Sequence, residues 1–269
     1  MVDADKLVAD ALASDGRHTL VLTGAGISLA SGIPTFRGSD ASAVWATTAM
    51  ERATWRHFQR QPADSWAWYR QRLGIALGAA PNPAHRALTV LEAWSTGRHQ
   101  RVRIVTQNID PLHERAGARG LVKVHGSIDR ARCANPRCRL GATETTALAD
   151  LDFARFDQTP VADAIPRCRA CGGLMRPHVL WFDEQYGSHP SYEWPAVLET
   201  CETMTLALAI GTSFSVGVTD LVATTAAARR VPLIIIDPEA PSIPTGPRAV
   251  HLREKAEELL PAVCARLGA

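Results

Sequence analysis

The stretch from His18 to Gly32, HTLVLTGAGISLASG, decides the fold class. It opens with a short apolar run that favours a β-strand, and it continues through the turn Gly24-Ala25-Gly26 into a segment that favours a helix. Such a turn lets a ligand approach the backbone closely, and the following helix can hold phosphate oxygens at its amino terminus, which predicts dinucleotide binding. The turn is not G-x-G-x-x-G, because Leu29 occupies the place of the third glycine, so a plain tight turn is the alternative.

Four more short apolar runs predict strands, and helical stretches separate most of them. These runs are Val102 to Thr106, Leu121 to Val124, Met204 to Ile210 and Val231 to Ile236. None of them alternates strongly between apolar and polar residues, which is typical of parallel strands covered on both faces. The sequence therefore predicts an α/β protein with a doubly wound parallel, Rossmann-like sheet, whose ligands bind beyond the carboxyl ends of the strands.

Two segments do not fit this alternation of strands and helices, and we expect them to form a smaller lobe. Residues 37–80 favour helix, with apolar residues at helical spacing between Pro62 and Gly78. Residues 126–176 contain two cysteine pairs. We therefore expect one domain with two lobes. The large lobe is predicted to comprise residues 1–36, 81–125 and 177–269, and the small lobe the helical insertion 37–80 and the zinc-binding insertion 126–176.

The composition excludes several classes of protein. The chain has 269 residues, 46% of them hydrophobic and 21% charged, as in an ordinary globular protein. The formal net charge is only +2 and no run of like charges occurs, so we expect no binding to nucleic acid. The apolar runs are far shorter than the roughly 20 residues that cross a bilayer, so we expect no membrane span. The amino terminus lacks the features of a secretory signal, and we expect a cytoplasmic monomer.

Four of the six cysteines form two close pairs, Cys133 with Cys138 and Cys168 with Cys171. Two short hooks that each present two thiolates are the usual way to build a structural zinc site. The second pair has C-x-x-C spacing and is followed by two glycines, whereas the first pair is more widely spaced. We predict one structural zinc, with free or redox-active thiols as the alternative. The other two cysteines are expected to be buried as small hydrophobic residues.

Polar residues follow the predicted strands at the edge where the sheet should bind its ligand. They are Gln107, Asn108 and Asp110 after one strand, His125 after the next, Gly211 to Ser213 after a third and Asp237 after a fourth. The Gly211 loop suits phosphate or ribose, Asp237 can accept from ribose hydroxyls, and His125 can act as a base near neutral pH. A lone histidine is more often structural. We expect structural roles for the other eight, with His85 and His178 as hydrogen-bonding groups and the rest, including His113 and His189, at surfaces or element ends.

Taken together, these motifs resemble those of the sirtuin family of NAD-dependent protein-lysine deacylases. The matching stretches follow the family's order over nearly the whole chain. They are GAGISLASGIPTFRG at 24–38, PNPAHRAL at 81–88, TQNIDPLHERAG at 106–117, KVHGS at 123–127, the cysteine pairs, RPHVLWFDE at 176–184, GTS at 211–213 and KAEELLP at 255–261. Any one of these stretches could arise by chance, whereas the whole set is very specific.

The resemblance implies a reaction in which the acyl oxygen of a modified lysine attacks the anomeric carbon of the nicotinamide ribose of NAD. The products would be nicotinamide, free lysine and O-acyl-ADP-ribose. His125 would be the general base on a ribose hydroxyl, Asn108 would position the ribose and Asp110 would hold the nicotinamide carboxamide. Further NAD contacts are implied for Gly24, Ala25, Gly26, Phe36, Arg37, Gln107, Ile109, Gly211, Thr212, Ser213, Asp237 and Ala256.

The resemblance also indicates where the acyl-lysine peptide binds. The backbone carbonyl of Leu180 would accept from the lysine amide, Phe182 would form a wall, and the peptide would add as a strand. Tyr69 and Arg72 share one face of the predicted helix, and a phenol beside a guanidinium suits a carboxylate. This pattern is similar to the Tyr-x-x-Arg of the branch that removes succinyl and malonyl groups, and the small Ala53 agrees with that branch. We therefore expect a desuccinylase and demalonylase with some deacetylase activity. A solvated Arg72 is the alternative.

Some features depart from the family pattern or leave other functions open. Pro111 and Asp183 stand where glycine is usual, and Asp237 stands where asparagine is common. A carboxylate at Asp183, near the mouth of the acyl tunnel, could repel acidic groups. An ADP-ribosyltransferase or NAD hydrolase would share the nicotinamide-cleaving step, and a non-enzymatic NAD-sensing module would share the fold. Nicotinamide release that depends on acyl-lysine would separate these three functions.

Overall fold

The computed structural model describes residues 3–14, 16–35, 50–239 and 248–269, and its larger sheet has six parallel strands. The strands are β1 (His18–Thr23), β2 (Arg101–Thr106), β3 (Leu121–Lys123), β7 (Leu206–Ile210), β8 (Leu233–Ile236) and β9 (Ala249–Leu252). Their order is β3-β2-β1-β7-β8-β9, so the direction of winding reverses between β1 and β7. Doubly wound sheets bind ligands at such a switch point. The predicted fold class is confirmed.

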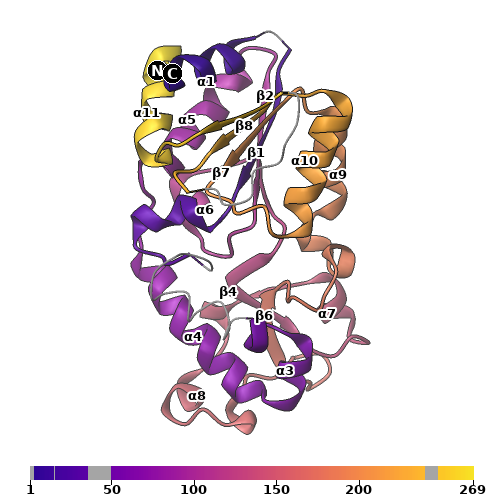
Figure 1. Ribbon diagram of the computed structural model, residues 1–269. Coiled ribbons are helices and arrows are strands. Elements are labelled where there is room, and N and C mark those ends of the chain that lie inside the picture. The colour runs from indigo at the N-terminus through magenta and orange to yellow at the C-terminus, as the bar shows by residue number, and fades with distance from the viewer. Residues whose placement is uncertain (1–2, 15, 36–49, 240–247) are drawn as a thin grey trace.

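Helices cover both faces of this sheet (Figure 1). One face carries α1 (Ala4–Ala13), α5 (Pro83–Thr96) and α11 (Ala256–Leu267), and the other carries α9 (Trp194–Thr203) and α10 (Gly217–Arg229). Strand β7 shows why the strands lack alternation. Leu206, Leu208 and Ile210 pack into the first core, whereas Ala207 and Ala209 pack into the second. Both faces of the strand are therefore apolar.

The glycine turn after β1 leads into η1 (Ala25–Ser31), a 3-10 helix where the sequence favours a helix start. Gly32 ends η1 in the left-handed conformation, with a φ of 83°, which glycine adopts without steric cost. Asn82 caps α5 by accepting from the amides of Ala84 and His85, and its side-chain amide donates to the Ile27 carbonyl over 2.7 Å. The start of α5 therefore fixes the position of η1 against the sheet.

The small lobe has an antiparallel sheet in the order β5-β4-β6. Its strands are β4 (Gly126–Cys133), β5 (Thr146–Ala147) and β6 (Met175–Val179), and its helices are α3 (Trp55–Arg60), α4 (Pro62–Gly78), α7 (Arg139–Thr143) and α8 (Ala154–Gln158). The predicted helix is confirmed as α4, which buries Trp66 against Phe153 with ring centroids 4.8 Å apart. Figure 1 shows this lobe below the large sheet, on the side where the parallel strands end.

Short elements connect these layers. They are α6 (Leu112–Ala116), η3 (Leu148–Asp150), η4 (Ala162–Ala164), η5 (Tyr186–Ser188) and η6 (Pro190–Tyr192). Among the described residues, no helix combines the length and the apolar character that a membrane span requires.

Candidate functional site

Three glycines from two turns interlock at the switch point between β1 and β7. The amide of Gly24 donates to the Ile210 carbonyl, and the amide of Gly26 donates to the Gly211 carbonyl over 2.9 Å. A Cβ on Gly24 would lie 2.6 Å from the Gly211 oxygen, and a Cβ on Gly211 would lie 2.3 Å from the Ile27 nitrogen. Gly211 also has a φ of +59°. The backbones of the two predicted NAD-binding turns can touch only because no side chain stands between them.

A buried polar cluster lies below the glycine turn. The side-chain amide of Asn108 donates to the Gly24 carbonyl and to the Ser28 hydroxyl, both over 3.1 Å. Ser28 donates in turn to Asp110 over 3.0 Å, and the other Asp110 oxygen accepts from the Leu112 amide. Burial raises the pKa of Asp110 in spite of these hydrogen bonds. The structure therefore brings Asn108 and Asp110 together with the glycine turn, and it adds Ser28, to which the sequence analysis gave no role of its own.

Gln107 connects the same turn to the loop after β7. Its side-chain amide donates to the Thr23 carbonyl over 3.3 Å and to the Thr212 hydroxyl over 3.1 Å. Ile109, two residues further on, accepts from the Ile128 amide and so joins this loop to β4 of the small lobe. Two loops with predicted NAD contacts, 106–110 and 211–213, therefore form one surface together with the glycine turn.

His125 lies where β3 leads into β4, at the junction of the two lobes. Its Nδ1 is 2.8 Å from the Gln107 carbonyl oxygen. A carbonyl can only accept, so Nδ1 carries the proton and Nε2 presents its lone pair. Burial lowers the pKa of His125 to about 4, against the opposing effect of the Gln107 carbonyl. The imidazole is therefore neutral near neutral pH, which is the state that a general base requires.

The backbone of His125 also joins the predicted peptide-binding segment. The His125 carbonyl accepts from the Leu180 amide over 2.9 Å. Two residues after Leu180, the Phe182 amide donates to the Ala53 carbonyl over 3.0 Å. Ala53 is buried, whereas the Phe182 side chain is 55% exposed. The segment 180–182 is therefore held between the candidate base and Ala53, which lies two residues before the start of α3.

The carboxylate of Asp183 caps α3. Its two oxygens accept from the amides of Trp55 and Arg56 over 2.7 and 3.1 Å. Carboxylates are stabilised at a helix amino terminus because unpaired amides and the helix dipole favour negative charge there. The sequence suggested that this charge could repel acidic groups at the mouth of the tunnel. In the structure both carboxylate oxygens of Asp183 accept hydrogen bonds from the start of α3. The negative charge of Asp183 is therefore directed at this helix.

Tyr69 and Arg72 lie on α4, and Tyr69 contacts the segment 180–182. The Trp181 indole donates to the Tyr69 hydroxyl over 2.8 Å, which leaves the phenol proton to serve as a donor. Burial raises the pKa of Tyr69 well above its usual value, and the Trp181 hydrogen bond and the charges of Arg176 and Arg72 partly oppose this effect. Partial burial lowers the pKa of Arg72 to about 10, so the guanidinium stays charged near neutral pH. It stacks on Trp68 and donates to the Trp68 carbonyl.

The four paired cysteines converge in the small lobe. Their sulfur atoms all lie within 4.8 Å of one another, with Cys133 and Cys171 3.5 Å apart and Cys138 and Cys168 3.8 Å apart. Four thiolates about 2.3 Å from a tetrahedral zinc would be separated by about 3.8 Å, so the cluster fits a structural zinc. Gly172, directly after Cys171, has a φ of +70°, and its amide donates to the Cys168 carbonyl. The second cysteine pair therefore lies on a tight turn that Gly172 makes possible.

The remaining predicted contacts are placed as follows. Asp237 follows β8 and accepts from the Glu239 amide, and Ala256 is buried as the first residue of α11. Ser213 exchanges a hydrogen bond with Ser215 over 2.8 Å. Phe36 and Arg37 lie outside the described residues.

Two pairs of buried histidines flank the site. His85 and His113 have ring centroids 4.8 Å apart, and so do His178 and His189. The expectation that His113 and His189 lie at surfaces or element ends is wrong in respect of exposure, because they are 1% and 2% exposed. His113 turns inward to bond the Thr23 hydroxyl over 3.0 Å, and His189 bonds Ser191 over 2.7 Å. The position of a histidine along the chain does not predict which side chain it will hydrogen-bond, or whether it will be buried.

We expect the free energy of unfolding to fall steeply as the pH drops below about 6.5. Burial lowers the pKa of His85, His113, His178 and His189 to about 4, about 3, about 2 and about 4. Between these values and 6.5, the unfolded chain binds protons that the native state excludes. Together with His125, whose pKa burial also lowers to about 4, these groups predict a loss on the order of 10 kcal/mol between about pH 7 and pH 5, measured by urea unfolding.

Two variants test the origin of this pH dependence. His178→Gln should make the decline shallower by about one proton, whereas the exposed His18→Asn should leave it unchanged. A free energy of unfolding that is constant over this pH range would contradict the prediction.

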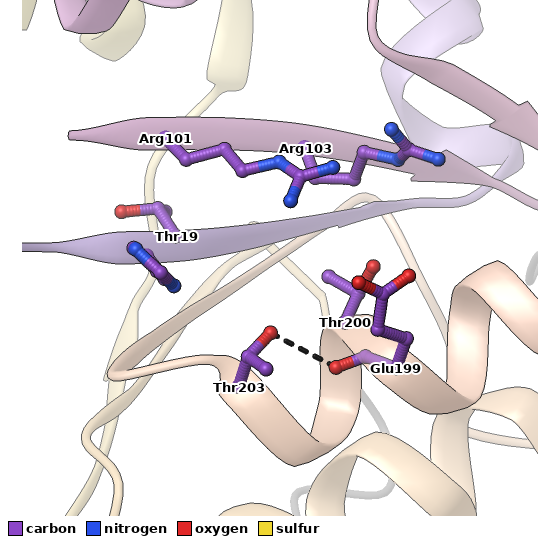
Figure 2. A pocket seen from close by; sticks show the side chains of 7 residues that line it. Thr19, Arg101, Arg103, Glu199, Thr200 and Thr203 are labelled. Atoms are coloured by element: carbon purple, nitrogen blue, oxygen red, sulfur yellow. Dashed lines mark hydrogen bonds between the residues drawn. The ribbon is translucent and has the colours of Figure 1, made fainter. Parts of the chain in front are cut away.

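A small pocket lies at the opposite edge of the large sheet. Figure 2 shows Arg101 and Arg103 on β2 and Thr19 on β1, facing Glu199 and Thr203 of α9. These residues lie near the amino ends of β1 and β2, whereas the glycine turn lies at the carboxyl end of β1. This pocket is therefore separate from the candidate site.

Comparison with known proteins identifies the family. The Sir2 family model matches residues 24–218, well over half of the chain. The chain is 39% identical to NAD-dependent protein deacylase 2 of Pyrobaculum aerophilum, with 94% of this chain and 92% of that protein covered. It is 36% identical to an NAD-dependent protein deacylase of Mycobacterium tuberculosis, with coverage of 93% and 97%. It is also 36% identical to the mitochondrial deacylase sirtuin-5 of Canis lupus familiaris, with coverage of 87% and 75%.

Solved structures agree with these relatives. A Sir2 homologue in complex with NAD superposes with a TM-score of 0.77 at 31% identity and covers 97% of this chain and 94% of that one. A Sir2 complex with a p53 peptide and NAD has a TM-score of 0.75 at 26% identity, with 98% of each chain covered. With the parallel sheet, the interlocked glycine turns and the four-cysteine cluster, these matches show that the chain belongs to the Sir2 family and is an NAD-dependent protein deacylase.

Proposed function

We propose that the enzyme prefers acidic acyl groups, such as succinyl and malonyl, on lysine and also removes acetyl groups to some extent. The observation that carries this proposal is the placement of Tyr69 and Arg72 one turn apart on α4, with the Tyr69 hydroxyl bonded to Trp181 of the segment 180–182. In a buried setting, a fixed phenol donor beside a guanidinium favours a carboxylate strongly over a methyl group. The Tyr-x-x-Arg spacing, which resembles that of the sirtuin branch that removes succinyl and malonyl groups, also supports this preference.

At the reacting centre, we propose that His125 is the general base and that Asn108 positions the sugar. NAD supplies the anomeric carbon and the leaving nicotinamide. The neutral imidazole, with Nδ1 bound to the Gln107 carbonyl, can take a proton at Nε2 from a ribose hydroxyl. Asn108 is held by Gly24 and Ser28, so its orientation is set before substrates bind. We assign Asp110 to the nicotinamide carboxamide because it lies in the same buried cluster.

We propose that the peptide adds as a strand along the segment 180–182. The amides of Leu180 and Phe182 are already bonded to the carbonyls of His125 and Ala53. The Leu180 carbonyl is therefore held in a fixed orientation from which it can accept from the lysine amide. We also propose, on the basis of the sequence, a division into two lobes at the predicted boundaries, a monomeric state and a cytoplasmic location.

We expect wild-type enzyme to show a kcat/KM about 100-fold higher for a succinyl-lysine peptide than for the matched acetyl-lysine peptide. Arg72→Met keeps the aliphatic length and removes the charge, so it should lower succinyl removal about 100-fold and change acetyl removal only a few-fold. NAD-dependent product formation, followed by mass spectrometry, measures both reactions.

Arg70→Met is the matched control on the same helix. Arg70 pairs with Asp157 and lies over Phe153, so its loss should not alter acyl preference. A preference for acetyl that persists in Arg72→Met would end the proposal. Nicotinamide release that needs no acyl peptide would point instead to NAD hydrolysis.

A further inference from the structure

Tyr186 of η5 lies against the candidate base. Its hydroxyl oxygen is 3.4 Å from Nε2 of His125, and the two rings stack with centroids 5.7 Å apart at 22°. Trp194 of α9 stacks on Tyr186, with centroids 4.3 Å apart at 14°. The rings of His125, Tyr186 and Trp194 form one stack that holds the phenol beside the base.

The direction of the hydrogen bond follows from the other partners. Nδ1 of His125 donates to the Gln107 carbonyl, so Nε2 can only accept. The Val218 amide donates to the Tyr186 oxygen over 3.2 Å, which uses one of its acceptor positions. Burial raises the pKa of Tyr186, so the phenol is protonated near neutral pH. The phenol proton therefore points to Nε2.

The same hydroxyl joins the base to the helix that follows the Gly211 loop. Val218 is the second residue of α10, and a Cβ on Gly217 would lie 3.5 Å from the Tyr186 ring. An amide at a helix amino terminus carries partial positive charge, and a phenol that accepts from it becomes a stronger donor. Tyr186 thus connects His125 to the loop where NAD contacts are proposed.

We propose that Tyr186 is a positioning residue that donates to Nε2 of His125 and holds the imidazole until a ribose hydroxyl of NAD takes its place. Nε2 has one lone pair in the ring plane and accepts one well-aligned donor at a time. A general base must lie about 2.6–3.2 Å from the hydroxyl that it deprotonates, so the phenol must yield that position. The inference rests on the proposed role of His125.

Among the residues that the structure describes, few other titratable groups surround His125. From β2, the contact is the Gln107 backbone carbonyl, and from η5 it is the Tyr186 phenol. The charge of Asp220 on α10 contributes to the raised pKa of Tyr186. Lys123 directs its ammonium to the Asp110 carbonyl, Glu114 and Ser127. A change in the titration of His125 after loss of the phenol can therefore be assigned to Tyr186.

Tyr186→Phe keeps the ring stack and removes only the donor. With imidazole nitrogens observed by NMR near neutral pH and His125 assigned by its absence in His125→Ala, the Nε2 signal should move toward that of a free acceptor. The acid limb of kcat/KM for NAD, measured at saturating acyl peptide, should move up by about half to one pH unit, because the neutral imidazole loses a stabilising donor. The acid limb of kcat should stay in place, because the ribose hydroxyl has then replaced the phenol.

Tyr192→Phe is the matched control. Tyr192 is buried and stacks on His178, with centroids 5.0 Å apart, so its loss of a hydroxyl should move neither the NMR signal nor the pH profile. An unchanged Nε2 signal in Tyr186→Phe would overturn the inference, and equal shifts in kcat and kcat/KM would overturn the exchange with the ribose hydroxyl. Because the NMR readout does not depend on turnover, it tests Tyr186 even if His125→Ala shows that the base has been assigned wrongly.

Discussion

Replacing His125 with alanine is expected to lower kcat for deacylation about 1000-fold while NAD binding is retained. The imidazole is the group that receives the ribose proton, whereas NAD is expected to be held mainly by the glycine turn, the 106–110 loop and the Gly211 loop. Turnover is measured with an acylated peptide by mass spectrometry, and NAD affinity by calorimetry. His125→Gln should be similarly impaired, because an amide nitrogen cannot take up the proton at neutral pH.

His18→Ala is the control for the loss of a histidine. His18 is exposed at the start of β1, at the edge of the sheet that lies away from the proposed site, so turnover should stay within a few-fold of wild type. If His125→Ala turned over at a near-normal rate, the ring would not be the base. If His125→Ala failed to bind NAD, the loss of turnover would reflect a disrupted NAD-binding site and would not test proton transfer.

Removing zinc is expected to unfold the small lobe. Structural zinc contributes on the order of 10 kcal/mol to folding in small zinc-binding domains, because the metal site is absent from the unfolded chain. Cys133 at the end of β4 and Cys168 beside the Arg167–Leu174 bridge connect the zinc cluster to the core that contains Tyr69 and Trp181. Chelation should therefore lower the thermal midpoint and abolish activity together, as followed by circular dichroism and zinc release.

Cys168→Ser should reproduce the effect of chelation, whereas Cys201→Ala should not. Cys201 is buried on α9 in the core of the large lobe and has no part in the cluster, so its loss removes only a small apolar contact. A Cys168→Ser protein that retained one zinc per chain and the wild-type midpoint would contradict the four-cysteine assignment.

Most strands of the large sheet could be predicted because each is a continuous run of apolar residues, which is visible in the local sequence. In β1 and β7, both faces are buried, so the run of apolar residues is itself the signal. Strand β9 was not predicted. It is an edge strand whose short sequence, AVHL, includes the 39% exposed Val250 and a histidine, so it lacks the apolar run that marks the buried strands.

The candidate site was predictable where it consists of residues next to a strand end. Gln107, Asn108 and His125 are of this kind, and the structure places them together. Tyr186 was not predictable, because its contact with His125 depends on where η5 lies relative to β3 and α10. The role of Asp183 was missed for the same reason, since the helix that it caps begins 128 residues earlier. Contacts of this kind follow from tertiary packing and leave no pattern in the local sequence.

The contact between the two glycine turns limits how this enzyme can be redesigned. Gly24, Gly26 and Gly211 meet main chain to main chain, so a methyl group at any of them would force both turns apart, and no second change nearby could restore the fit. The geometry of these two predicted NAD-binding turns is therefore not adjustable by substitution at the three glycines. An engineer who wants the protein to accept an altered dinucleotide has to work through the surrounding side chains, with Gln107 and Ser213 as the first positions to vary.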